Sequence, residues 1–143
     1  MKVITWNCNG AFRNKYHALE DIGADILVIQ ECEDPSRSTI KYREWAGDYL
    51  WAGENKNRGI GIFSKNGHKL EALNWNDDGL QLFLPCRVGG SVNVIGVWTK
   101  QANSPNFRYI GQLWKYLQLH REKIGSANTI ICGDFNSNVQ WDE

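Results

Sequence analysis

The sequence predicts an α/β fold with mixed sheets and flanking helices, and two observations support this prediction. The segments 4–10, 25–31 and 129–136 each begin with a short apolar run, which is typical of strands buried on both faces. Between residues 49 and 99, short apolar segments alternate with clusters of Gly, Asn and Asp, as in an antiparallel meander. At 143 residues the chain is long enough for one domain with a substantial core.

The N-terminal part predicts a parallel βαβ unit. A strand, a helix and a second strand are predicted at residues 2–7, 13–22 and 25–31. The helix is amphipathic because Tyr16, Leu19 and Ile22 recur at helical spacing, and Gly23 would end it. Two strands linked through a helix favour parallel pairing. A second short helix is predicted at residues 40–45.

The middle of the chain predicts antiparallel strands joined by tight turns, and the last third predicts a helix and a strand. The five predicted strands are residues 49–52, 59–64, 70–75, 80–86 and 92–99. The pairs Asp78-Gly79 and Gly89-Gly90 are typical of hairpin turns. The longest helix is predicted over residues 105–124 and precedes the final strand.

Polar side chains follow three of the predicted strands where each strand ends. They are Asn7, Glu31, Asp134 and Asn136. In layered α/β folds, chemistry collects where the rigid strands meet solvent. We therefore expect these four side chains to converge at one edge of a sheet, in an oxygen-rich pocket suited to Mg²⁺. Asp134 and Asn136 are two positions apart, so in an extended segment both would lie on one face.

Four motifs in this order resemble those of the endonuclease/exonuclease/phosphatase superfamily, which includes exonuclease III-like nucleases, deoxyribonuclease I and inositol polyphosphate 5-phosphatases. They are residues 4–10, Gln30-Glu31, residues 57–65, and Gly133 to Asn136. Together they span nearly the whole chain. The resemblance implies a two-sheet α/β sandwich of the deoxyribonuclease I-like type. Residues 1–143 would be the N-terminal portion of a single such domain.

The resemblance also implies a role for each motif residue. Glu31 and Asn7 would bind the divalent metal, Mg²⁺ or Mn²⁺. Asp134 would orient or deprotonate the attacking water, and Asn136 would stabilise the charge that develops on the phosphate. Tyr109 would lie near that phosphate. The candidate substrate contacts are polar, cationic or aromatic groups, namely Asn9, Arg58, Arg108 and Trp98.

Each of these residues also has a structural interpretation. Glu31 would then be a solvated carboxylate at a strand end, and Asn7 and Asn9 would be turn residues. Asp134 and Asn136 would form an Asx-turn after the last strand. By the same logic Tyr109 would be a helix-surface residue and Trp98 part of the core.

The predicted function is that of a divalent-metal-dependent phosphoester hydrolase, first of all a nuclease-type phosphodiesterase acting on nucleic acid or on a phosphorylated small molecule. The alternatives are a phosphomonoesterase of the same superfamily and a non-catalytic binding module that kept the fold. Many phosphatase members carry a His where this chain has Trp98-Thr99, which disfavours a phosphatase. The family's later Ser-Asp-His motif has no counterpart before Glu143. We therefore expect a fragment, a proteolysed product or a natural truncation, with little activity in this chain.

Charge and cysteine usage limit the expected partners, metal sites and cellular compartment. The chain has 16 Lys and Arg against 16 Asp and Glu, so no overall basic field indicates nucleic acid. The four cysteines lack C-x-x-C spacing, which argues against a zinc site and for small buried thiols in a reducing compartment. No apolar run is long enough to span a membrane, so we expect a cytoplasmic protein. An incomplete second sheet would leave apolar surface uncovered and favour self-association.

Overall fold

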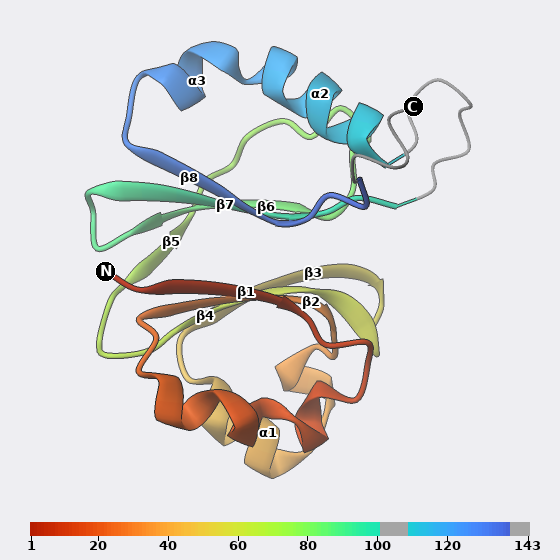
Figure 1. The fold of residues 1–143 in the computed structure, drawn as a ribbon, viewed down its shortest axis with the longest axis vertical. Coiled ribbons are helices and arrows are strands. Elements are labelled where there is room, and N and C mark those ends of the chain that lie inside the picture. Colours follow the sequence, from red (N-terminus) through yellow and green to blue (C-terminus); the bar gives the residue numbers. More distant parts are fainter. Residues whose placement is uncertain (101–108, 138–143) are drawn as a thin grey trace.

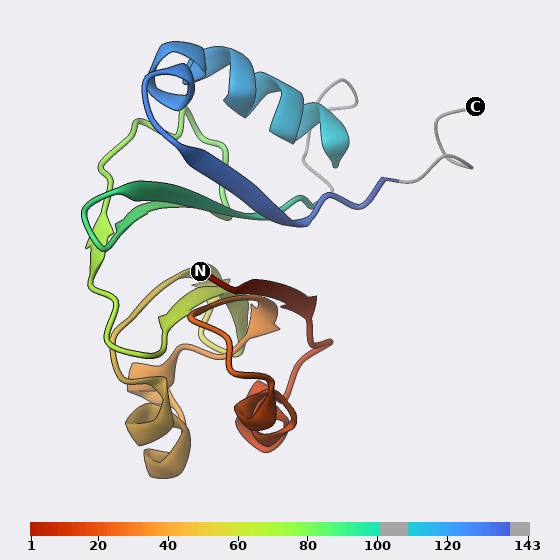
Figure 2. The same ribbon diagram turned by 60° about the vertical axis from the view of Figure 1, so that its left-hand side comes forward.

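Two sheets stack face to face, and helices cover the outer face of each sheet (Figure 1). The structure, a computed structural model, describes residues 1–100 and 109–137. The view turned by 60° separates the same four layers (Figure 2). The first sheet has the strand order β1-β2-β4-β3 and the second has the order β5-β6-β7-β8.

Each sheet has its own helical cover. The strands of the first sheet are β1 (Val3–Asn7), β2 (Ile26–Cys32), β3 (Tyr49–Asn55) and β4 (Arg58–Ser64). Its cover consists of the 3₁₀ segments η1 (Phe12–Asn14), η2 (Tyr16–Ile22) and η3 (Pro35–Arg37), and of α1 (Ile40–Ala46). The second sheet comprises β5 (Leu70–Ala72), β6 (Phe83–Val88), β7 (Val92–Trp98) and β8 (Thr129–Asp134), covered by α2 (Ile110–Leu119) and α3 (Arg121–Gly125).

The strand pairing confirms the parallel unit and corrects the meander. β1 pairs with β2 in parallel, as the intervening helical segment predicts. β7 and β8 form a second parallel pair, and the other pairs are antiparallel. The predicted meander is divided, because β3 and β4 join the first sheet while β5, β6 and β7 belong to the second. The described residues supply four strands to each sheet.

The core lies in three apolar layers because the central strands are buried on both faces. In β2, Ile26 and Val28 face the second sheet, whereas Leu27 and Ile29 pack against the helical cover. This double burial is the reason that β2 reads as an uninterrupted apolar run. The third layer, between the second sheet and α2, contains Leu80, Phe83, Ile95, Val97, Leu113 and Tyr116.

The helix predicted at residues 13–22 is instead two 3₁₀ segments, η1 and η2. The bonds are of the i to i+3 type, with the Lys15 N–H donating to the Phe12 carbonyl at 2.8 Å. The buried Glu33 carboxylate accepts the backbone N–H groups of Phe12 and Arg13, at 2.8 and 3.3 Å. These tertiary contacts hold η1 against the sheet, and Lys15 separates it from η2.

The remaining predicted features are partly confirmed. The Gly89-Gly90 turn joins β6 to β7 as predicted, but Asp78-Gly79 lies within the long connection between β5 and β6. The long helix is divided at His120 into α2 and α3, and its predicted start at residue 105 lies outside the described residues. The four cysteines are free thiols. In the described part of the chain no helix is long and apolar enough to cross a membrane.

Candidate active site at the strand ends

Asn7, Glu31 and Asp134 meet where β1, β2 and β8 end. The Asn7 Nδ2 group donates hydrogen bonds to Glu31 Oε1 at 3.0 Å and to Asp134 Oδ2 at 2.7 Å. The predicted convergence is therefore present for these three residues. It does not occur at one edge of a sheet, because Asp134 belongs to the second sheet. The cluster joins the ends of both sheets, since their stacking places β1 beside β8.

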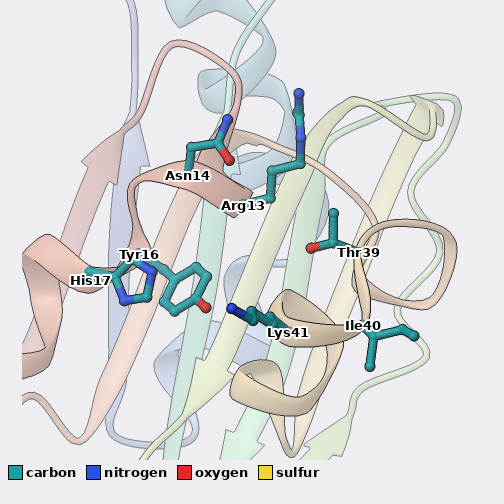
Figure 3. Close-up of a pocket in the computed structure, with 7 residues that line it drawn as sticks. All are labelled: Arg13, Asn14, Tyr16, His17, Thr39, Ile40 and Lys41. Carbon is teal, nitrogen blue, oxygen red and sulfur yellow. The ribbon is translucent and has the colours of Figure 1, made fainter.

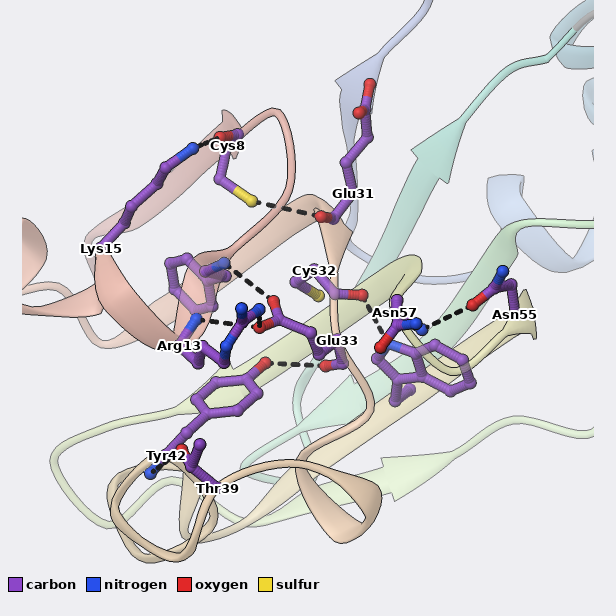
Figure 4. A network of polar contacts seen from close by, with 12 residues as sticks. Cys8, Arg13, Lys15, Glu31, Cys32, Glu33, Thr39, Tyr42, Asn55 and Asn57 are labelled. Atoms are coloured by element: carbon purple, nitrogen blue, oxygen red, sulfur yellow. Dashed lines mark hydrogen bonds and ion pairs between the residues drawn. The ribbon is translucent and has the colours of Figure 1, made fainter.

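A bulge in β2 directs the Glu31 side chain toward this cluster. The β2–β4 register shifts between Gln30 and Cys32, and the intervening Glu31 has a left-handed backbone with φ of 64°. Such bulges re-aim a side chain near functional sites, and a non-Gly residue adopts this φ only when its surroundings hold it there. Figure 4 shows the Glu31 carboxylate directed away from that of Glu33. The Glu31 side chain keeps 16% of its surface exposed.

Asp134 is held by its own turn and by the preceding glycine. Gly133 has φ of 148°, and a Cβ there would lie 1.9 Å from the Val97 carbonyl oxygen, so β8 can pair with β7 only if this residue is Gly. Asp134 Oδ1 accepts the backbone N–H of Asn136 at 2.9 Å. This is the Asx-turn of the structural interpretation, and it fixes the carboxylate rather than removing it from the cluster.

Asn136 does not lie in an extended segment, so the argument from its spacing with Asp134 is wrong. Its φ is 45°, and its side-chain Nδ2 donates to the Thr99 carbonyl at 2.7 Å. The backbone N–H of Thr99 in turn donates to the Asp134 carbonyl at 3.0 Å. Asn136 thus ties the end of β8 to the segment that follows β7.

Arg58 reaches the cluster from the first residue of β4. Its guanidinium forms an ion pair with Glu31 Oε2, and 53% of its side chain is exposed. Asn7 closes the other side of the cluster, because its Oδ1 accepts the backbone N–H of Asn9 at 3.0 Å. Asn7 is therefore both a turn residue and a contact of both carboxylates. In this orientation the Asn7 amide presents its nitrogen to the cluster, and a metal contact through Oδ1 would need the amide to turn.

The other predicted substrate contacts and the catalytic candidate Tyr109 have different outcomes. Asn9 is exposed beside the cluster, where its backbone completes the Asn7 turn. Trp98 is not available for base stacking, because it is only 6% exposed and packs between the sheets. Tyr109 precedes α2 and is 40% exposed, and its backbone N–H donates to Lys100. Arg108 lies outside the described residues.

Three residues that hold the segments around the cluster were not predicted from the sequence. Lys15 Nζ donates to the Cys8 carbonyl at 2.6 Å and holds the loop after β1 (Figure 4). Glu33, with 3% of its side chain exposed, forms an ion pair with Arg13 at 2.8 Å. Thr99 receives the Asn136 bond. Residues two apart on a regular strand would share a face, so the different directions of Glu31 and Glu33 follow from the bulge at Glu31 and from the end of β2 at Cys32.

The donor set fits a hard divalent cation of the Mg²⁺ type. Within residues 1–100 and 109–137, no cluster of three or more His, Cys, Asp or Glu side chains could hold a metal ion. Mg²⁺, however, needs only one or two carboxylates because it keeps several waters. Glu31 and Asp134 both accept from the Asn7 Nδ2 atom, which brings the two carboxylates together at the strand ends. Burial raises the pKa of the Cys8 thiol to about 11, which disfavours its thiolate form.

A separate groove of about 450 Å³ lies on the helical side of the first sheet (Figure 3). Its walls come from the η1–η2 region and from the start of α1. The lining residues are Arg13, Asn14, Tyr16, His17, Thr39, Ile40 and Lys41. None of the predicted site residues lines it, so it is distinct from the strand-end cluster.

Comparison with known proteins agrees with the sequence motifs. The sequence model of the Endonuclease/Exonuclease/phosphatase family matches residues 4–143. The search of curated proteins found no match. Among solved structures, an AP endonuclease from Archaeoglobus fulgidus aligns with a TM-score of 0.65 and 20% identity, over 95% of this chain and 57% of its own.

Two further solved structures have the same architecture. The 3'-5' exonuclease NExo from Neisseria meningitidis has a TM-score of 0.67 and 24% identity, over 95% of this chain and 58% of its own. TDP2 from D. rerio, complexed with single strand DNA product, has a TM-score of 0.63 and 18% identity, over 95% of this chain and 60% of its own. The chain thus spans less than two thirds of these structures. At these identities they show the fold, and they confirm the predicted two-sheet α/β sandwich.

Proposed function

The chain belongs to the endonuclease/exonuclease/phosphatase family, and on this premise we propose that it is a metal-dependent phosphodiesterase of the nuclease type. The family comprises nucleases, phosphodiesterases and phosphatases, whose members generally depend on a divalent metal. The observation that carries the proposal is the junction of Glu31 and Asp134 through the Asn7 amide. Two carboxylates drawn together from two sheets, and sharing one donor, suit the binding of a cation.

The proposed roles follow from the contacts of each side chain. Glu31, with Asn7 as the second candidate ligand, would hold Mg²⁺ or Mn²⁺. When bound, such an ion acts as a Lewis acid toward a phosphoryl oxygen. Asp134 would orient or deprotonate the attacking water, since two hydrogen bonds from the protein fix its carboxylate. Arg58 would stabilise the phosphate, whereas Asn136, whose amide donates to Thr99, would hold the end of β8.

We propose single-stranded nucleic acid as the substrate class. One structural neighbour, D. rerio TDP2, is complexed with single strand DNA product. In this chain the exposed Arg58 guanidinium beside the carboxylate cluster suits a phosphate group, because its fork of donors matches phosphate geometry. Formal charge is balanced overall, so the proposed recognition is local to the strand ends rather than spread over the surface.

Hydrolysis of an end-labelled single-stranded oligonucleotide in Mn²⁺ tests the proposal. We expect low turnover that EDTA abolishes and that Glu31→Gln lowers by roughly a hundred- to a thousand-fold, as for the loss of a preorganised electrostatic group. Glu54→Gln, which changes an exposed carboxylate on β3 of the same sheet, is the matched control and should retain activity. Turnover that is independent of metal, or equal in Glu31→Gln and wild type, would contradict the proposal. Oligonucleotide binding without turnover would favour a non-catalytic module.

A further inference from the structure

We propose that Arg58 competes with the divalent cation for Glu31 and becomes available to a phosphate only when the cation displaces it. Metal binding and phosphate binding would then be coupled through one side chain. The inference rests on the proposed function, since it assigns a regulatory role within the same site. It adds an order of events, with the cation first and the phosphate second.

Both oxygens of the Glu31 carboxylate already have partners. Oε1 accepts from Asn7 Nδ2 at 3.0 Å, and Oε2 accepts from the Arg58 guanidinium. Little of the Glu31 side chain is exposed, so few directions of approach remain for a third group. A cation that approaches Oε2 would therefore meet the Arg58 guanidinium.

The backbone places Arg58 at this position. The register pairs Cys32 with Gly59, which brings the start of β4 opposite the β2 bulge that contains Glu31. On the other side of the hairpin, Asn55 pairs with Arg58, and Asn55 Oδ1 accepts the Asn57 N–H at 2.9 Å. The stem that carries Arg58 is thus fixed by pairing with both neighbouring strands.

Gly10 leaves the space in which the guanidinium lies. A Cβ added at Gly10 would lie 3.0 Å from Arg58 Nη2, and the Gly10 backbone has φ of 79°, which L side chains rarely adopt. The loop after β1 therefore accommodates the Arg58 head group against Glu31. This fit places the exposed Arg58 guanidinium on Glu31.

The Arg58 guanidinium and a divalent ion at Glu31 would compete by charge as well as by space. A guanidinium and a divalent ion on one carboxylate would repel each other at short range. A displaced Arg58 would remain on its rigid stem at the edge of the cluster, with more than half of its side chain exposed. A phosphate oriented on the cation would then offer it a new anionic partner with matching geometry.

The first test is Mn²⁺ binding in the absence of substrate, measured by calorimetry. We expect Arg58→Gln to bind Mn²⁺ about two- to fivefold more tightly than wild type, the range of an exposed ion pair that no longer competes. Arg37→Gln is the matched control, because Arg37 is 54% exposed and pairs with Asp34 at 2.9 Å, a partner that does not belong to the cluster. Equal Mn²⁺ affinity in Arg58→Gln and Arg37→Gln would overturn the inference.

The second test is binding of inorganic phosphate without metal. Glu31→Gln should release Arg58 and raise phosphate affinity about threefold, as expected for a modest surface interaction. Part of that rise would come from the lost negative charge alone, and the double variant with Arg58→Gln measures this part. A smaller rise in the Arg58→Gln background supports the inference. An equal rise in both backgrounds overturns it.

The two tests separate this inference from the proposed function. If Glu31→Gln leaves Mn²⁺ affinity unchanged, Glu31 is not the metal ligand and the proposed function fails at its first step. If Glu31→Gln weakens Mn²⁺ binding while Arg58→Gln behaves like the control, the proposed function stands. In that case only the competition by Arg58 is rejected.

Discussion

The two ends of β2 both carry acidic side chains with asparagine partners, but they differ in how charge is matched. At the amino end, Asp25 has three partners of its own. It accepts the Lys2 N–H at 2.6 Å and Asn66 Nδ2 at 2.9 Å, and His68 Nε2 lies 3.3 Å away. These bonds, first the one from Asn66, lower the pKa of Asp25 to about 2.

At the carboxyl end, two carboxylates share a single amide donor. Glu31 and Asp134 both accept from Asn7 Nδ2, Arg58 supplies one positive charge to Glu31, and Asp134 also accepts the Asn136 N–H. Asp25, a single carboxylate with several donors, has a purely structural role. Two carboxylates with fewer donors than they can accept are suited to bind a further cation. The balance of donors against carboxylates, rather than the residue types, distinguishes the candidate site.

Asp134→Asn tests this distinction with the largest expected effect. If Asp134 positions or deprotonates water, its replacement by Asn should lower the rate of phosphodiester hydrolysis by roughly a hundred- to ten-thousand-fold. Asp25→Asn, the same change at the other end, should leave the rate within about twofold, because that carboxylate contacts no site residue (an ordinary surface effect). Initial rates in Mn²⁺ provide the comparison. Similar losses in both variants would mean that the two ends do not differ in function.

Glu33→Gln tests whether Glu33 and Glu31, both at the carboxyl end of β2, have different roles. Glu33 is buried and accepts bonds from Phe12 and from Arg13, so its loss should cost about 1–3 kcal/mol in free energy of unfolding. Glu31→Gln, two residues earlier, should change that free energy by less than about 1 kcal/mol, since Glu31 serves the cluster rather than the core. Urea denaturation of both variants measures the difference. A larger cost at Glu31 would make it the structural carboxylate instead.

The pH dependence of stability tests the amino end. The folded pKa of Asp25, about 2, lies below its ordinary value of 3.8, so this group stabilises the fold above about pH 4. That contribution is lost as the pH falls from about 4 to about 2. We expect Asp25→Asn to flatten this part of the acid-unfolding curve. An unchanged slope between wild type and variant would show that the Lys2 and Asn66 contacts do not stabilise the charged form.

The smallest effect concerns the outer edge of β8, near the cluster. Among the described strands β8 ends the second sheet, and Ile130 on it is exposed. We propose weak self-association through this edge, with a dissociation constant on the order of 0.1 mM or weaker, below the strength of a standard interface. Ile130→Lys should abolish it, as charged edge residues do in natural sheets. Light scattering over a concentration series measures the change, and a monomer at all concentrations would reject the proposal.

The sequence predicted most of the strands and the members of the cluster, but not how each side chain is used. The apolar run of β2 and the polar residue after it were sufficient to select Glu31. Trp98 ends an equally clear strand, yet it is buried between the sheets. Asn136 satisfies the spacing rule, but its left-handed backbone sends its amide to Thr99. The roles assigned to these residues in catalysis stay predictions.

Local patterns by themselves determined the parallel pair of β1 and β2, the double burial of the central strands and the family motifs, because periodicity and strand-end chemistry are properties of neighbouring residues. Only the tertiary structure decided that Asn7 bridges Glu31 to Asp134, that Arg58 lies on Glu31 and that a bulge turns Glu31 outward. The Asn7–Asp134 bond joins positions 127 residues apart. It depends on how one sheet stacks on the other, and no pattern within a single strand specifies that stacking.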